Sequence, residues 1–588
     1  MNIMQKILLI ITLIASLNTN AALGPIPIYL NTEYRTDSPV IGSIASTLSF
    51  SADDIKATGA NTFLDFLATV PSVGLYNPYG NVAALFMRGG DSDHTLVLVD
   101  GVSVNSIDSL NGAVEYGLTS IALNDIEKIE IIKNSGSVLY GSSAISGVIN
   151  ITTKKGADGA SATLGIKFGT HNSKTYTLSA NNGGKDGFVR FTHNKYTTDG
   201  INAQTGDTTG EKDNINNQTT QIKAGNKHFD IGYLESRNKT QYDGFSGTDA
   251  GELSDIKLNK IAINANKKFS NTWKSTFSLT QTKSKRDSGA SATTIGDKYK
   301  KTTITALNDI KIDDALLNIG LSQVKSENTT NKLKHSSKDL FINWQKNIND
   351  LDINAGLRYI KHNKFGSHTV YNMGFGKELG NGIRLTSNYN TAFQAPTLKE
   401  VTSGNQINDL KPETSKNINI ELSKNHVWGE VSLSLFKTKE KDGIGYTGGW
   451  PNSIYINEDQ YSAKGVDLSL NANISGYNLS FNHVYSKSSV NNSNTQPIRR
   501  PKNITNLTIA KQYAKFNARA QVITRSSSLD SGVALDGYTL INLSNSYNIN
   551  NSAKVLLNIK NATDKNYTIA NGYNQPSRTV EIGLDYQF

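Results

Sequence analysis

The stretch that decides the fold of this chain is VDLSLNANI, at residues 466–474. Apolar side chains stand at every second position, and polar side chains fill the positions between them. Because successive side chains of a β-strand point to opposite faces, this alternation predicts a strand with one apolar and one polar face. A second run, YNLSFNHVY at residues 477–485, follows after a short turn and has the same pattern.

The same two-faced alternation recurs through the C-terminal three quarters of the chain. It is clear at residues 164–168, and clusters of Asn and Ser, as at residues 491–494, separate the runs. The last residues, VEIGLDYQF at 580–588, still alternate, as expected of a strand that closes a barrel. Strands whose apolar residues alternate with polar ones in this way are typical of transmembrane barrels, and the length of residues 157–588 makes about twenty strands plausible.

The composition is compatible with such a barrel. The chain is 37% hydrophobic with a mean hydropathy of −0.39, as expected when half of each strand faces a polar interior. A soluble sandwich or propeller would also alternate, but no repeat of about 40 residues is visible. Cysteine is absent, which excludes disulfides and thiolate chemistry. The net charge of +10 is spread thinly, which favours a solvated surface over a nucleic-acid site.

The N-terminus carries a signal for export. Lys6 precedes an apolar stretch at residues 7–17, and small residues suitable for cleavage follow at Asn20-Ala21-Ala22. We therefore expect residues 1–21 to be a signal peptide. A membrane-anchoring helix is the alternative, but it needs about 20 apolar residues, and this stretch is roughly half as long.

Residues 48–156 predict a small α+β domain. Serine and acidic residues at 51–55 mark the start of a short helix, and residues 61–68 predict another. Short apolar runs, one followed by an Asp-Gly turn, predict strands at residues 85–88, 95–99, 126–132 and 147–151.

Five sequence motifs follow one another in order along the chain. They are FMRGG with VLVDGV at residues 86–102, VLYGSSAISGVINI at 138–151, AFQAPTLKE at 392–400, LKPE at 410–413, and NATDKNY at 561–567 with Arg578. In these motifs the chain resembles the TonB-dependent outer-membrane receptors. The resemblance implies an all-β transmembrane barrel of 22 antiparallel strands in the outer membrane of a Gram-negative bacterium, with an N-terminal α+β plug domain inside the barrel.

The resemblance also implies a function and partners. Receptors of this family import scarce, bulky nutrients, and we expect TonB, with ExbB and ExbD as its energy source, to drive the import. The chain itself has no phosphate-binding loop for a nucleotide. We expect a monomer surrounded by outer-membrane lipid and lipopolysaccharide, with no nucleic-acid partner, no catalytic cofactor and no enzymatic activity.

The plug departs from the family pattern at two places. Lys133-Asn134-Ser135 stands where Arg-Gly-Pro is usual, and Ser146 stands where glycine is common. The positive charge is kept at Lys133. The freedom of glycine to adopt a positive φ is lost at Ser146, so we expect a local difference in plug geometry.

Within the family, the barrel size and the loop around NKTQYDGF at residues 238–245 are most similar to the cobalamin (vitamin B12) transporters. That resemblance implies cobalamin as the cargo and calcium on the extracellular loops, because Ca²⁺ binds clustered carboxylate oxygens. Ordinary solvated loop aspartates are the alternative. The candidate calcium ligands are Asp199, Asp213, Asp243 and Asp255.

The segment at residues 22–47, which we expect to be extended, contains the candidate TonB box. Its β-branched and aromatic residues can pair as a strand added to the sheet of a partner. A disordered linker is the alternative interpretation. The box residues are Ile28, Tyr29, Leu30, Asn31 and Thr32.

Polar and aromatic segments that join the plug strands are candidates for ligand contact, because they suit a ligand with amide and ring surfaces. Simple turns are the alternative. The residues that we favour are Tyr76, Tyr79, Asn81 and Asn105.

Two alternative functions stay open. The first is a siderophore or haem receptor of the same family, for which His94, His362 and His368 are the histidines to consider. The second is a passive porin, which would have no folded domain at residues 48–155.

Overall fold

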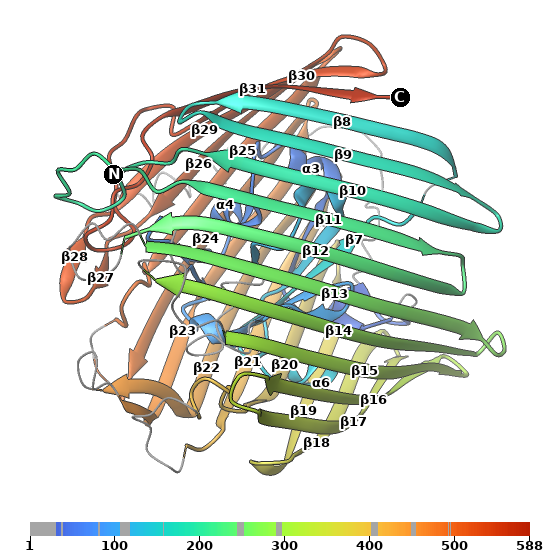
Figure 1. The fold of residues 1–588 in the computed structure, drawn as a ribbon. Helices are drawn as coiled ribbons and strands as arrows, with labels where there is room; N and C mark the ends of the chain where they lie inside the picture. The colour runs from blue at the N-terminus through green and yellow to red at the C-terminus, as the bar shows by residue number, and fades with distance from the viewer. Residues whose placement is uncertain are drawn as a thin grey trace.

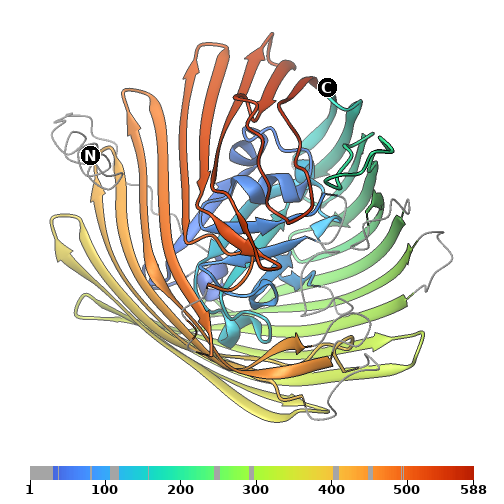
Figure 2. The same cartoon turned by 90° about the vertical axis from the view of Figure 1, so that its left-hand side faces the viewer.

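The chain forms a barrel of β-strands around an N-terminal domain, as Figure 1 and Figure 2 show from two sides. In the described part of this computed structural model, 22 strands form one closed ring, which agrees with the expected number. The prediction of an all-β barrel with an α+β plug is confirmed. The structure describes residues 31–36, 39–79, 83–105, 118–156, 158–243, 252–289, 297–401, 410–447, 454–491, 493 and 496–588.

The barrel strands are joined alternately by short turns and longer loops, and the ring closes where β31 pairs antiparallel with β8. A small hairpin of β27 (Ser528–Asp530) and β28 (Val533–Leu535) stands in one long loop. The barrel strands are β8 (Gly159–Gly169), β9 (Ser173–Gly184), β10 (Gly187–Thr198), β11 (Ile215–Gly225), β12 (Phe229–Tyr242), β13 (Glu252–Lys268), β14 (Trp273–Gly289), β15 (Asp297–Ile312), β16 (Ala315–Asn328), β17 (Leu333–Ile348), β18 (Leu351–His362), β19 (Gly366–Gly380), β20 (Ile383–Gln394), β21 (Glu413–His426), β22 (Gly429–Thr447), β23 (Ile454–Ile474), β24 (Tyr477–Val490), β25 (Asn503–Tyr513), β26 (Phe516–Arg525), β29 (Tyr538–Asn548), β30 (Ala553–Lys560) and β31 (Thr579–Gln587).

The outer face of the barrel is apolar and its inner face is polar. In β31, Val580, Ile582, Leu584 and Tyr586 are between 36% and 57% exposed, whereas Glu581 is 8% exposed. An apolar exterior around a polar interior is the arrangement of a barrel that sits in lipid. None of the helices in the described part of the chain has the length and apolar character needed to cross a membrane.

The domain inside the barrel is built on a five-stranded sheet with the order β1-β6-β7-β4-β5, in which β4 and β7 run parallel. Its core packs phenylalanines of a helix against isoleucines of the sheet, as with Phe66 and Ile149, both fully buried. The elements are α2 (Asn31–Tyr34), β1 (Thr47–Ser51), α3 (Ala52–Lys56), α4 (Phe63–Thr69), β2 (Val73–Tyr76), β3 (Ala84–Met87), η1 (Ser92–His94), β4 (Thr95–Val99), β5 (Val102–Ser103), η3 (Leu123–Asp125), β6 (Ile126–Ile132), α6 (Ser137–Tyr140) and β7 (Gly147–Thr153).

Both predicted helices begin at the expected capping residues. The Ser51 hydroxyl accepts the N–H of Asp54, and the Asp54 carboxylate accepts the N–H of Ser51 in return. Thr62 caps the second helix by accepting the N–H of Asp65 at 3.1 Å. These caps satisfy backbone donors that have no partner inside the helix.

The two departures from the family pattern have clear structural outcomes. Ser146 does not adopt a positive φ, so the lost freedom of glycine has no consequence there. Its hydroxyl instead fills the space in front of Gly90, where an added Cβ would lie only 2.0 Å from that oxygen. Lys133 keeps an ionic role, because its ammonium lies 2.7 Å from Asp467 of the barrel.

Candidate functional site

A cavity of about 320 Å³ lies between the plug and one side of the barrel wall. Volumes of this size are typical of sites for small molecules. Burial raises the pKa of Tyr79, the plug tyrosine that lines the cavity, so its hydroxyl stays neutral. The barrel contributes four more tyrosines, which are Tyr196, Tyr242, Tyr538 and Tyr567.

The structure does not bring Tyr76 to this cavity. Tyr76 is 4% exposed and packs in an apolar cluster with Phe86 and Tyr573. The guanidinium of Arg499 lies over its ring, 3.8 Å from the centroid. Tyr76 therefore packs against the loops above the plug and is not among the residues that line this cavity.

Asn105 is occupied by the backbone of its own domain. Its side-chain oxygen accepts the N–H of Val97 at 2.8 Å, and its NH₂ donates to the carbonyl of Thr95 at 3.0 Å. These bonds extend the edge of the plug sheet beside β4. Asn81 lies outside the described residues.

The barrel tyrosines and His171 line the cavity, but the sequence alone did not single them out. A signal existed, because Tyr196 stands near the end of β10, Tyr242 ends β12 and Tyr538 begins β29. Tyrosines at strand ends beside long loops are therefore the pattern that could have found them.

Three carboxylates from two loops converge beside the cavity. Glu211, Asp213 and Asp243 each offer an oxygen, and these oxygens all lie within 4.8 Å of one another. Two consecutive backbone N–H groups orient the aspartates: Ala203 donates to Asp213 and Gln204 donates to Asp243, both at 3.1 Å. Such clustered hard oxygen donors fit Ca²⁺.

The other two predicted calcium ligands lie elsewhere. Asp255 forms a two-point ion pair with Arg237, with N···O distances of 2.9 and 2.6 Å. Asp199 is exposed and accepts a hydrogen bond from Asn172 at 3.3 Å. The structure thus brings together two of the four predicted residues and adds Glu211, which the sequence did not indicate.

Comparison with known proteins decides the family. The model described as TonB-dependent Receptor Plug Domain matches residues 39–148, and the model described as TonB dependent receptor-like, beta-barrel matches residues 148–562. The chain belongs to the TonB-dependent receptors. It is therefore a multi-pass β-barrel protein of the Gram-negative outer membrane.

Individual relatives of this receptor fall into two groups. The protein named Vitamin B12 transporter BtuB of Photobacterium profundum is 25% identical over 594 residues, 95% of each chain. That of Vibrio cholerae serotype O1 is 24% identical over 616 residues, 98% of each chain. Among solved structures, a mutant of the ferric enterobactin receptor PfeA from Pseudomonas aeruginosa has a TM-score of 0.79 at 16% identity, covering 96% of this chain and 100% of that one. The siderophore receptor PirA from Acinetobacter baumannii has a TM-score of 0.80 at 16% identity, covering 92% and 98%. The two structures show a shared fold.

Part of the N-terminal segment of the receptor, expected to be extended, is helical in the structure. Asn31–Tyr34 form a short helix, and the Glu33 carboxylate accepts the N–H groups of Ile44 and Ala45 at 2.7 and 2.8 Å. This carboxylate folds the chain back on itself. Burial raises the pKa of Glu33.

Part of the candidate TonB box docks on the plug. Thr32 is 1% exposed, donates to Glu130 at 2.6 Å and accepts the hydroxyl hydrogen of Tyr140 at 2.7 Å through its carbonyl. Ile28, Tyr29 and Leu30 lie outside the described residues. The assignment of the box therefore stays a prediction.

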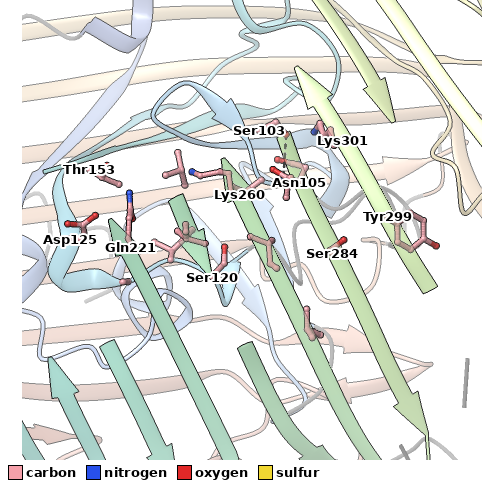
Figure 3. Close-up of a pocket in the computed structure, with 18 of the residues that line it drawn as sticks. Ser103, Asn105, Ser120, Asp125, Thr153, Gln221, Lys260, Ser284, Tyr299 and Lys301 are labelled. Carbon is pink, nitrogen blue, oxygen red and sulfur yellow. Dashed lines mark hydrogen bonds between the residues drawn. The ribbon is translucent and has the colours of Figure 1, made fainter. Parts of the chain in front are cut away.

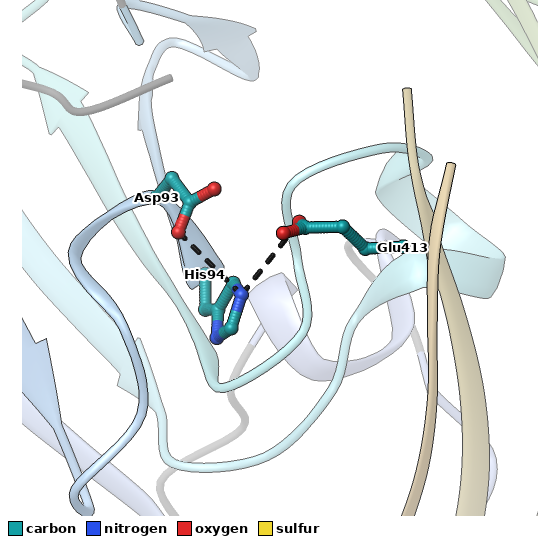
Figure 4. Close-up of side chains that lie close together, drawn as sticks. All are labelled: Asp93, His94 and Glu413. Carbon is teal, nitrogen blue, oxygen red and sulfur yellow. Dashed lines mark ion pairs between the residues drawn. The ribbon is translucent and has the colours of Figure 1, made fainter. Parts of the chain in front are cut away.

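A buried ionic cluster lies where the plug meets β21 and β22. His94 Nε2 lies 3.5 Å from Asp93, 3.7 Å from Glu413 (Figure 4) and 3.2 Å from Glu440, and all four side chains are almost fully buried. Burial lowers the pKa of His94, but the charges of Glu440 and Asp93 outweigh it and raise that pKa.

This cluster fits a shared proton better than a metal ion. The backbone N–H of Asp91 donates to His94 Nδ1 at 3.1 Å, so Nδ1 must carry its lone pair. The proton then resides on Nε2 and faces the carboxylates. A metal ligand would need the lone pair on Nε2 instead.

Proposed function

We propose that this receptor imports a cobalamin across the outer membrane, with TonB, ExbB and ExbD supplying the energy. The proposal depends on one contact, between the loop that holds the carboxylate cluster (Glu211, Asp213 and Asp243) and the cavity. A Cβ on Gly200 would meet both the carbonyl of Asp213 at 1.9 Å and the ring of Tyr79 at 3.2 Å. The loop that holds Asp213 is therefore packed directly on the plug tyrosine that lines the cavity.

That contact gives calcium a role in capture. A cation bound by Glu211, Asp213 and Asp243 would join two extracellular loops and fix them above Tyr79. Ordering the loops before the ligand arrives lowers the entropy lost on binding. The named vitamin B12 transporters that align along 95% or more of this chain support the choice of cargo.

A siderophore or haem is the second candidate cargo. One observation favours haem, because His171 lines the cavity. The histidines considered from the sequence do not: His94 is in the buried cluster, His362 accepts the N–H of Phe365, and His368 stacks on Phe393. A passive porin is disfavoured by the domain that fills the bore. We further infer a monomer in lipid and lipopolysaccharide, without enzymatic activity.

A binding panel on the purified receptor tests the proposal. Equilibrium binding of cyanocobalamin, haem and a ferric catecholate is measured with and without a calcium chelator. Cyanocobalamin is expected to bind most tightly and to lose affinity when calcium is removed. Tighter binding of haem or the catecholate would reject cobalamin as the cargo.

A further inference from the structure

A second cavity adjoins the tyrosine-lined one and shares Ile256 and Arg286 with it. It lies between the plug and the wall of β11 to β15, and Figure 3 shows the side chains around it. Its volume of about 60 Å³ is enough for a few water molecules or one small oxyanion. A bulky nutrient does not fit there.

One row of inward-facing side chains forms much of the wall. The register pairs Gln221 with Leu234, Leu234 with Lys260, Lys260 with Thr282, and Thr282 with Lys301. All five side chains line the cavity. Because cross-strand partners share a face of the sheet, both lysines point into the barrel with one strand between them.

These two lysines have no counter-ion among the described residues. Lys260 is 8% exposed, and no ion pair joins it or Lys301 to a carboxylate in the part of the chain that the structure describes. Two plug carboxylates have charges that act on Lys260, and each of them already forms an ion pair with another cation. Asp125 lies 2.9 Å from Arg190, and Asp100 lies 2.9 Å from Lys223.

The opposite wall of the cavity brings polar but mostly uncharged groups. The plug contributes Ser103, Asn105 and Ser120 there, and its one carboxylate in the lining, Asp125, pairs with Arg190. Two ammonium groups that face one small, low-dielectric space raise its positive potential, and an anion placed between them is attracted more strongly than in water. The Ser103 hydroxyl accepts the N–H of Asn105, so its own hydrogen can be donated to an anionic oxygen.

We propose that this cavity binds one small oxyanion of the phosphate or carboxylate class, held by Lys260 and Lys301. The anion comes either from free solution or from a phosphate or carboxylate group of the passing cargo. Binding of a free anion at this place would not require the imported nutrient.

Anomalous diffraction from crystals of the purified receptor grown with selenate tests the site. An anomalous peak within hydrogen-bond distance of Lys260 and Lys301 is expected in the native protein. The peak should be lost in the double variant Lys260→Gln/Lys301→Gln. A native crystal without the peak, or a double variant that keeps it, would overturn the proposal.

A matched control removes the same two positive charges from lysines on the outer face of the barrel wall. Lys283 and Lys325 are exposed, lie on β14 and β16, and alternate with the inward residues Thr282 and Ser326. Lys283→Gln/Lys325→Gln should keep the selenate peak; its loss would contradict a local site. The migration of heated and unheated samples on a gel checks that the barrel of each variant has folded. If a variant does not fold, the presence or absence of the selenate peak in the native crystal alone decides whether the proposal holds.

Uptake measurements then separate the two sources of the anion. If the lysine pair holds a group of the passing cargo, Lys260→Gln/Lys301→Gln lowers uptake at least tenfold while surface binding is unchanged. If it holds a free anion, uptake is unchanged and the selenate peak still depends on the lysines. Because selenate binding requires no nutrient, its failure is distinct from failure of the cobalamin proposal.

Discussion

The guanidinium of Arg88 lies 3.1 Å from the carboxylate of Asp467, and both side chains are buried. Arg88 comes from the plug and Asp467 from β23 of the barrel. Lys133, also of the plug, lies 2.7 Å from the same carboxylate, and the amide of Asn482 donates to it at 2.8 Å. Two plug cations thus share one barrel anion, which ties the plug to the wall.

Asp467→Asn should loosen this attachment without disturbing the barrel. It leaves two buried cations without their counter-ion, a change that costs about 3–5 kcal/mol in other proteins. Hydrogen exchange of β3 and β6 is therefore expected to rise at least a hundredfold, while β8 to β31 stay protected. Asp564→Asn is the control, because its pair with Arg578 is half exposed. Unchanged hydrogen exchange in β3 and β6 would contradict the role of Asp467 in holding the plug to the barrel wall.

The cluster of Glu211, Asp213 and Asp243 should bind Ca²⁺. Asp213→Asn/Asp243→Asn removes two charges and is expected to weaken Ca²⁺ binding, measured by calorimetry, at least tenfold. Asp207→Asn is the control, since Asp207 lies in the same loop and its carboxylate accepts hydrogen bonds within that loop, from Asn202 and Thr209. Equal calcium affinity in the native receptor and the double variant would remove these residues as ligands.

Tyr79 and Tyr76 should respond differently to truncation. Tyr79→Ala and Tyr196→Ala are each expected to lower ligand affinity about tenfold, because both rings line the cavity. Tyr76→Ala should instead destabilise the loops, since replacing a buried aromatic ring by alanine costs about 3–5 kcal/mol. Binding isotherms and thermal unfolding separate the two effects. If Tyr76→Ala lowers ligand affinity in a fully folded receptor and Tyr79→Ala does not, Tyr76 and not Tyr79 contacts the ligand.

Proline at the candidate TonB box should abolish uptake and spare capture. Tyr29→Pro or Leu30→Pro removes a backbone N–H that strand addition to TonB requires. Cellular uptake is expected to fall to background while binding to whole cells is unchanged. Tyr29→Phe keeps the N–H and the ring and should transport normally. Normal transport by both proline variants would show that the TonB box does not lie at these residues.

Much of the fold was readable in the sequence because its causes are local. Alternation at residues 466–474 and 580–588 specifies two-faced strands, since the side-chain period of a strand is fixed by backbone geometry. The capping residues Ser51 and Thr62 mark helix starts because they satisfy N–H groups within three residues of themselves.

The candidate sites depended on partners that are distant in the sequence. Asp255 and Asp243 look equivalent in the sequence, yet the pairing of β12 with β13 places Arg237 beside Asp255 and leaves Asp243 in the carboxylate group. Strand alternation fixes which face a side chain takes but not its neighbour across the sheet.

The sequence by itself therefore determined a plugged barrel, because period and capping act over a few residues. Only the tertiary structure decided which charges meet. The row from Gln221 to Lys301 exists because five strands take one register, and Arg88 meets Asp467 because the plug sits inside the closed ring. Both arrangements are set by long-range packing, in which each partner is chosen by the whole fold.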